Sequence, residues 1–214
     1  MKFINPKLTP EIDRGDATDS YLSHDPFIRG VFRWRLKKVL ELCPEKIDQD
    51  ILDIGIGSGV LLPSLCQYGN VYGIDIELKF VKKSRKVIEV HKINAILLNA
   101  DIIHLPFQDN KFDTIYCISV LEHIKDLDSV LKEISRVMKN NGILIVGVPV
   151  EGVLVNAFFR YRKIDEYVRE VHVSNHNDIK EKIQNHLKIV EERRLPLDFL
   201  SDSLSFYKIF KCQK

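Results

Sequence analysis

A glycine-rich stretch, residues 53–59, constrains this chain more than any other feature, and its sequence is D-I-G-I-G-S-G. The preceding run Asp50–Ile54 is typical of a buried strand, and Val60–Cys66 has the pattern of the first turns of a helix. A strand, a glycine loop and a helix present backbone N–H groups to a ligand, and glycines allow its close approach. Twenty residues after Gly55, Asp75 ends the next apolar run. A carboxylate there can accept both hydroxyls of a ribose, so the sequence predicts a nucleoside-binding unit.

The spacing of the glycines separates two classes of nucleotide-binding protein. Nicotinamide and flavin enzymes have the pattern G-x-G-x-x-G/A. Gly55 and Gly57 fit that pattern, but Val60 stands at its last position and the third glycine, Gly59, comes one residue early. The pattern D-x-G-x-G-x-G resembles motif I of the class I S-adenosylmethionine (SAM)-dependent methyltransferases. The resemblance extends over roughly residues 51–149.

The resemblance implies how this part of the chain would bind SAM. Asp53 would order the glycine loop and help to hold the amino-acid end of SAM, and Asp75 would bind the ribose. The implied contacts in this region are Asp53, Gly55, Ile56, Gly57, Gly59, Asp75 and Ile76. The alternative for both acids is a capping role, with Asp75 capping the helix that begins near Glu77.

A second motif, N-A-D-I-I-H-L-P-F at residues 99–107, resembles the third cofactor motif of the same family. The resemblance implies that Asp101 accepts a hydrogen bond from the adenine amino group. The N–H of Ile102 would donate to a ring nitrogen of the adenine. This role for an acid depends on its position and requires no change of its protonation.

Residues 112–124 resemble motif IV of small-molecule methyltransferases, which commonly ends in leucine-glutamate-histidine. The resemblance places Ser119 and Val120 beside the methionine moiety of SAM. Glu122 and His123 can form a general acid/base couple, and His123 is therefore a candidate catalytic residue. The same pair occurs across the family with unrelated substrates, so a structural role in the pocket is the alternative.

From residue 50 onward, apolar runs alternate with helical patterns, which is typical of a parallel sheet with right-handed crossovers. Strands are expected at 50–54, 70–74, 95–98, 112–118, 143–148, 187–195 and 205–211, and helices at 25–42, 60–68, 78–92, 126–138 and 178–185, the last capped by Asn177. The expected fold is α/β: a Rossmann-like, doubly wound, mostly parallel seven-stranded sheet with helices on both faces. The resemblance implies that the last strand is antiparallel.

Two irregular segments are expected to cover the carboxyl edge of this sheet. Residues 1–45 would form a lead-in and cap helix, and residues 46–214 a SAM-binding domain with 150–177 as a substrate-side insertion. The candidate substrate-binding residues are Tyr21, Arg29, Phe158, Tyr161 and His172, and His172 is also a second candidate catalytic residue. The alternatives are that the basic helix face around Arg29 is solvated, that His172 is a packing histidine, and that both segments only cap the sheet.

The composition excludes several classes of protein. The 214 residues carry a formal net charge of +2, which is too small to favour nucleic acid as a partner. No run of 18 apolar residues occurs, so no membrane span is expected. The four cysteines lie far apart with no metal-ligand spacing, which favours a reduced, cytoplasmic protein without a metal site.

These patterns predict a SAM-dependent methyltransferase that methylates an O, N or C nucleophile of a small organic acceptor, with S-adenosylhomocysteine (SAH) as product. An RNA or protein methyltransferase and a non-catalytic SAM-binding partner subunit are the alternatives. A nicotinamide oxidoreductase would share the loop and Asp75, but Val60 and the segment around Asp101 argue against it. The sequence leaves the oligomeric state and the identity of the acceptor open.

Overall fold

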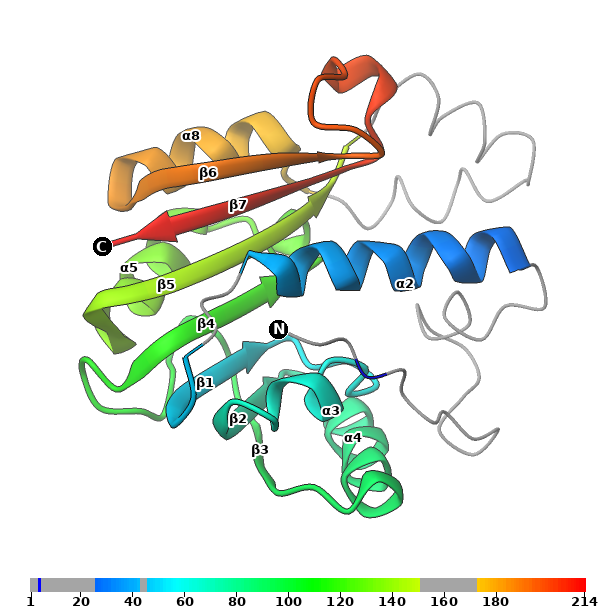
Figure 1. Cartoon of the computed structure of the whole chain (residues 1–214). Coiled ribbons are helices and arrows are strands. Elements are labelled where there is room, and N and C mark those ends of the chain that lie inside the picture. Colours follow the sequence, from blue (N-terminus) through cyan, green and yellow to red (C-terminus); the bar gives the residue numbers. More distant parts are fainter. Residues whose placement is uncertain (1–3, 5–25, 43–45, 151–172) are drawn as a thin grey trace.

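The computed structural model describes residues 4, 26–42, 46–150 and 173–214, and a seven-stranded sheet forms its centre (Figure 1). The strands are β1 (Gln49–Ile54), β2 (Gly69–Asp75), β3 (Ala95–Asn99), β4 (Phe112–Ile118), β5 (Met138–Pro149), β6 (Lys188–Leu195) and β7 (Tyr207–Gln213). Their order across the sheet is β3-β2-β1-β4-β5-β7-β6. Strands β1 to β5 pair in parallel, whereas β7 is antiparallel to both β5 and β6. The predicted fold class is confirmed, including the antiparallel last strand.

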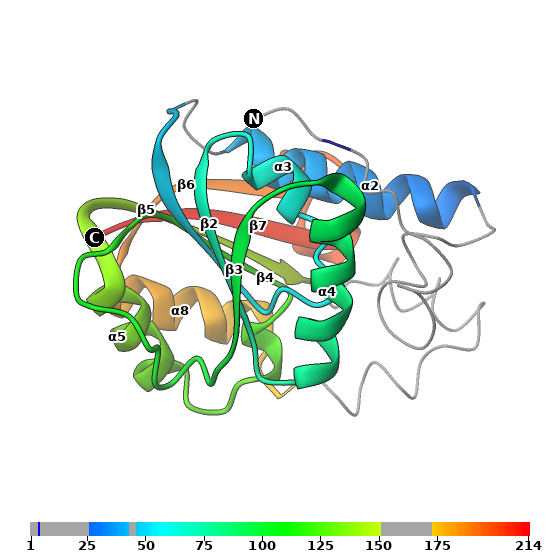
Figure 2. The same ribbon diagram turned by 90° about the horizontal axis from the view of Figure 1, so that it is seen from below.

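Helices cover both faces of the sheet (Figure 2). Helices α2 (Pro26–Glu41), α3 (Leu62–Leu65) and α4 (Leu78–His91) pack on one face, and α5 (Leu127–Val137) and α8 (His176–His186) pack on the other. Within β4, Ile115 and Cys117 belong to the core under α5 and α8, while Tyr116 belongs to the core under α2. Burial of alternate residues on opposite faces explains the nearly continuous apolar run of this strand.

Side-chain caps fix the starts of α5 and α8. The carboxylate of Asp126 accepts a 3.1 Å hydrogen bond from the N–H of Ser129. Asn175 accepts from the N–H groups of Asn177 and Asp178, and Asp178 completes a capping box. The predicted cap at Asn177 was wrong, because the N–H of Asn177 is one of the two donors that Asn175 satisfies.

Two element boundaries differ from the prediction by several residues. Helix α3 spans only Leu62–Leu65, because the chain leaves the glycine loop in turns and β2 already begins at Gly69. Strand β5 begins at Met138 rather than at residue 143, because Met138 pairs directly with Phe112 before a register irregularity. Neither difference changes the order of the elements.

The carboxyl ends of the parallel strands carry the segments that the sequence analysis identified. The strand order runs outward from β1 in both directions, so the chain reverses between β1 and β4. Open α/β sheets bind ligands at such a reversal, beyond the carboxyl ends of the strands. No helix in the described ranges is long and apolar enough to cross a membrane.

Candidate functional site

The glycine loop follows β1 and has left-handed backbone at Gly55 (φ 71°), Gly57 (φ 51°) and Gly59 (φ 73°). A Cβ added at Gly55 would lie 2.3 Å from Cγ2 of Val120, so the loop touches the end of β4 here. No atom of the described residues lies within 4 Å of a Cβ built at Gly57. The loop therefore leaves open space beside Gly57 and brings Gly55 against Val120.

Asp75 ends β2 and holds the glycine loop in place. Its Oδ2 accepts a 3.0 Å hydrogen bond from the N–H of Gly57, and its Oδ1 accepts a 2.9 Å bond from the N–H of Glu77. Burial raises the pKa of Asp75, and these two N–H groups oppose the rise. Asp75 thus accepts from the N–H of Glu77, which is the N-cap residue of α4, and also lies against the glycine loop, but no side chain among the described residues caps the N-terminus of α4 itself.

Two further side chains hold the glycine loop and the end of β2 in place, and sequence reasoning missed both. The amide of Asn99, at the end of β3, donates to the carbonyl oxygens of Asp75 and Ile76 at 2.8 Å each. The hydroxyl of Ser84, from α4, donates to the carbonyl oxygen of Gly57 at 2.9 Å. Ser84 follows buried Val81 by three residues, so its helical phase was a readable signal for contact with the loop.

Asp53 is a buried carboxylate at the end of β1, with 3% of its surface exposed. Burial and the negative charge of Asp75 raise the pKa of Asp53 to about 7. Among the residues that the structure describes, none donates a hydrogen bond to this carboxylate or pairs with it. A cationic group of a ligand beside Asp53 would favour its ionised form.

The other predicted SAM contacts that follow β1, β2 and β3 include both buried and exposed side chains. Ile56 and Ile102 are buried in the two cores, and the N–H of Ile56 donates a 3.0 Å hydrogen bond to the carbonyl oxygen of Ile74. Asp101 is exposed, and its Oδ1 accepts a 3.0 Å hydrogen bond from the N–H of Ile103. Ile76, next to Asp75, is 69% exposed.

The end of β4 holds a polar cluster that sequence reasoning found only in part. Ser119 has left-handed backbone (φ 58°), and its hydroxyl lies 2.8 Å from the hydroxyl of Tyr207. Arg35 of α2 donates to the Ser119 hydroxyl at 3.3 Å. The guanidinium carbon of Arg35 also lies 4.6 Å from the ring centre of Tyr207 and 4.9 Å from that of Phe32. The interpretation of the basic α2 residues as a solvated face is wrong for Arg35.

Glu122 and His123, which were predicted to form a couple, lie in different environments. Both residues lie in the short 3₁₀ helix η1 (Leu121–His123), but Glu122 is 2% exposed and His123 is exposed. Burial raises the pKa of Glu122 to about 7, against the opposing positive charge of Arg35. Oε2 of Glu122 has no hydrogen-bond partner among the described residues. The buried group with an unpartnered oxygen is therefore Glu122, whereas the prediction favoured His123 as catalytic.

Several predicted substrate-side residues cannot be compared with the structure. Tyr21, Phe158, Tyr161 and His172 lie outside the described residues. Arg29 is partly buried near the start of α2. After residue 172, the N–H groups of Val173 and Ser174 donate to the carbonyl oxygen of Glu122 at 2.7 and 3.1 Å. The segment leading into α8 is therefore held against the turn that carries Glu122.

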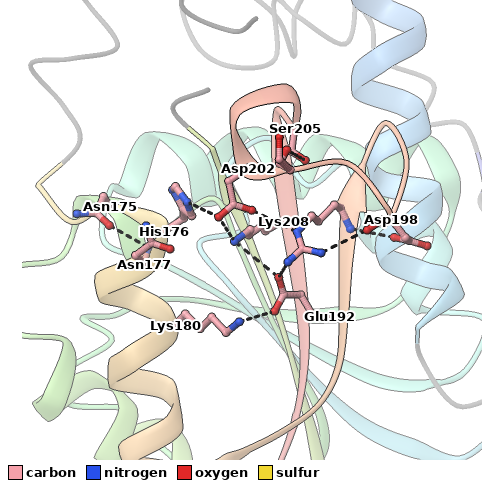
Figure 3. Close-up of polar contacts among 11 residues, drawn as sticks. Asn175, His176, Asn177, Lys180, Glu192, Asp198, Asp202, Ser205 and Lys208 are labelled. Carbon is pink, nitrogen blue, oxygen red and sulfur yellow. Dashed lines mark hydrogen bonds and ion pairs between the residues drawn. The ribbon is translucent and has the colours of Figure 1, made fainter. Parts of the chain in front are cut away.

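A second buried charged cluster lies between α8, β6, β7 and the loop that contains the 3₁₀ helix η2 (Asp202–Leu204) (Figure 3). Lys208 is 2% exposed, and its ammonium group lies 2.8 Å from Asp202 and 3.6 Å from Glu192. Lys180 lies 2.7 Å from Glu192, and His176 lies 3.3 Å from Asp202. We call these residues the Lys208 network, and its pairing of opposite charges indicates a structural role.

Comparison with known proteins adds independent evidence on the central part of the chain. Residues 52–146 match a protein family described as methyltransferase domain. This segment begins inside β1 and ends inside β5, so it contains the glycine loop, Asp75, Asp101 and the β4 end.

Individual relatives agree with the family match. An uncharacterised protein of Methanocaldococcus jannaschii is 38% identical over 110 residues, which are 51% of this chain and 45% of that protein's length. A demethylmenaquinone methyltransferase of Listeria monocytogenes is 28% identical over 166 residues, 72% of this chain and 67% of that protein. A solved structure of a SAM-dependent methyltransferase from Aquifex aeolicus aligns with a TM-score of 0.69 and 19% identity, covering 93% of this chain and 98% of that one. At that identity the likeness shows the fold.

Proposed function

We propose that this chain is a class I SAM-dependent methyltransferase that transfers the methyl group of SAM to an O, N or C nucleophile of a small organic acceptor. The match of residues 52–146 to a methyltransferase domain, the Listeria relative and the fold support this proposal. The observation that carries the proposal is the 3.0 Å hydrogen bond between the Gly57 N–H and the Asp75 carboxylate, which unites the glycine loop and the ribose acid in one site. Each carboxylate oxygen of Asp75 has a second lone pair for a ribose hydroxyl.

The chemistry of the other edge residues fits the two ends of SAM. The open space beside Gly57 accommodates the nucleoside, and Asp101 with the N–H of Ile102 would bind the adenine. The buried Asp53 carboxylate lacks a described cationic partner, and the ammonium group of the methionine moiety would supply one. Ser119 and Val120 would border the same moiety, since Val120 lies against Gly55.

A small acceptor is favoured over RNA or protein by the relatives and by the charge of the chain. The Listeria relative is named for a quinone acceptor, and this chain carries a formal net charge of only +2. The donor supplies an activated methyl group, so the protein's main contribution is the alignment of the two reactants.

A ligand-binding experiment tests the cofactor half of the proposal. SAM and SAH at ~100 times their dissociation constants should stabilise the protein by about 2.7 kcal/mol, and NAD and NADP should have no effect. The measurement is chemical unfolding with and without each ligand. Stabilisation by NAD alone would overturn the methyltransferase assignment.

A labelling experiment tests the acceptor half. The protein is incubated with methyl-labelled SAM and separate small-molecule, RNA and protein fractions of a cell extract. Label should appear in the small-molecule fraction. Label confined to the RNA or protein fraction would overturn the proposed acceptor class.

A further inference from the structure

Glu122 is a buried acid just after the end of β4, and no ion pair compensates its charge among the described residues. Only 2% of Glu122 is exposed, and its Oε2 has no hydrogen-bond partner among the described residues. An unsatisfied buried carboxylate destabilises a folded protein, so such groups are rare outside functional sites. In the Lys208 network, Oε1 of Glu192 also lacks a hydrogen-bond partner, but it lies 2.9 Å from Arg194 and 3.6 Å from the ammonium group of Lys208 (Figure 3).

The position of Glu122 connects it to the end of the site where the methyl group would be transferred. It follows Val120 by two residues, and Val120 lies against Gly55 of the glycine loop. Arg35 of α2, which bonds to Ser119, is the cation whose charge acts on Glu122. His123, next in the chain, is exposed on the same turn.

We propose that Glu122 is the proton acceptor of the methyl transfer, and that the acceptor molecule therefore presents a hydroxyl or amino nucleophile that carries a proton. This inference rests on the proposed function. The acceptor's heteroatom forms a bond to the methyl carbon, and the carbon–sulfur bond breaks with its electron pair left on sulfur. The proton of the heteroatom moves to the Glu122 carboxylate and from there to solvent. A pKa of about 7 suits a group that takes up a proton near neutral pH.

A binding experiment tests this without knowledge of the acceptor. Sinefungin has an amine where SAM has its methyl group, and it shares the nucleoside and amino-acid parts of SAH. The measured quantity is the dissociation constant of SAH divided by that of sinefungin, both from calorimetry. A larger ratio means a stronger preference for sinefungin. In the wild type, the Glu122 carboxylate should favour the sinefungin ammonium group, directly or through one water molecule. Glu122→Gln should reduce this preference about tenfold and leave SAH affinity within twofold.

The wild-type protein gives a second readout that requires no mutation. The preference for sinefungin should increase as the pH rises through about 7, because Glu122 becomes charged there. The titratable and charged groups that face it are Arg35 from α2, Cys117 from β4 and His123 on its own turn, and Asp53 from β1 acts on the same Cys117. Asp53 also has a pKa of about 7, but its effect cancels in the ratio because both ligands share the same amino-acid group.

The control is Glu89→Gln, which removes an exposed carboxylate of α4 and should leave the ratio unchanged. A ratio that is insensitive to both Glu122→Gln and pH would overturn the assignment of Glu122 while leaving the proposed function intact. A loss of preference in His123→Gln, with none in Glu122→Gln, would move the role to His123 and also overturn it. Failure of the wild type to bind SAH and sinefungin would instead overturn the proposed function.

Discussion

Two regions of this protein bury charge, and they do so in opposite ways. In the Lys208 network, the buried ammonium group lies within 4 Å of two carboxylates, Asp202 and Glu192. At the carboxyl edge, Asp53 and Glu122 are equally buried, and no cation among the described residues forms an ion pair with either. Buried charge is costly unless it is paired, so an unpaired arrangement needs another explanation.

The pKa values express the same contrast. Burial raises the pKa of Glu192 and of Asp202, but the ammonium groups of Lys180 and Lys208 outweigh burial, and both pKa values fall below their ordinary range. At the carboxyl edge, burial dominates and raises the pKa of Asp53 and of Glu122 to about 7. In the first region, the opposite charges are supplied by the protein. In the second, the described residues supply no ion pair, and charged or polar groups of a ligand would provide the missing partners, as expected of a binding site.

The largest expected effect comes from breaking the complete region. Lys208→Met should lower the free energy of unfolding by up to about 3–5 kcal/mol, because it removes the buried cation that pairs with both Asp202 and Glu192, which are partly exposed. Urea unfolding measures the loss, and SAH affinity should stay unchanged. Lys211→Met, on the same strand but partly exposed, is the matched control. A loss below about 1 kcal/mol would show that the network is not structural.

The pH dependence of stability should separate the two regions next. Asp53 has a folded pKa of about 7 against 3.8 unfolded, and Glu122 about 7 against 4.5. Their contribution to stability is therefore fully present below the unfolded pKa values and is lost as the pH rises through about 7. The ligand-free protein should lose up to about 3–4 kcal/mol per group between pH 4 and pH 8. For Glu192 and Asp202 the sign is reversed, so their contribution is lost only as the pH falls through their lowered pKa values.

Chemical unfolding from pH 4 to pH 8 measures this dependence, and Asp53→Asn isolates one group. The asparagine cannot ionise, so the fall in stability toward pH 8 should be smaller in the variant. An equal fall in the variant and the wild type would remove Asp53 as its source. Saturation with SAH should also reduce the fall, because the ligand's ammonium group would pair with ionised Asp53.

Asp75→Ala should weaken SAH binding by about 10- to 100-fold, because charge-assisted hydrogen bonds to the ribose are lost. The structure adds a second effect: the N–H groups of Gly57 and Glu77 lose their acceptor, so stability should fall by about 1–3 kcal/mol. Calorimetry and urea unfolding measure the two losses. Asp109→Ala removes an exposed acid and is the control. Unchanged SAH affinity in Asp75→Ala would exclude Asp75 from the ribose site.

The sequence predicted the features that local patterns encode. Alternating strands and helices indicated the parallel sheet. The twenty-residue separation of Gly55 and Asp75 in the sequence indicated that they lie at the ends of neighbouring strands. Contacts made by distant segments were missed. Ser119 contacts Arg35 and Tyr207, which lie 84 and 88 residues away in the sequence. These contacts depend on how α2 crosses the sheet and on the position of β7 between β5 and β6. No periodicity encodes such placements.

One signal for Arg35 was nevertheless present. Arg35 lies three residues after Phe32 and one before Leu36, on the apolar side of α2. A charged residue in that phase is expected to have a partner beneath the helix. The division of Glu122 and His123 had no such signal, because a single 3₁₀ turn is too short to show which residue is buried.

The smallest expected effect concerns the hydroxyl pair that joins β4 to β7. Tyr207→Phe removes the hydroxyl that lies 2.8 Å from Ser119 Oγ, but it keeps the aromatic ring under the Arg35 guanidinium. The expected loss of stability is about 1 kcal/mol, the net value of one hydrogen bond. Ser119→Ala removes the same bond together with the bond from Arg35, so its loss should be larger. A double-mutant cycle in urea should give a coupling of about 0.5–1 kcal/mol between Tyr207 and Ser119. No measurable coupling would mean that the two hydroxyls are bound to water instead, and the polar cluster at the end of β4 would then be less ordered than the Lys208 network.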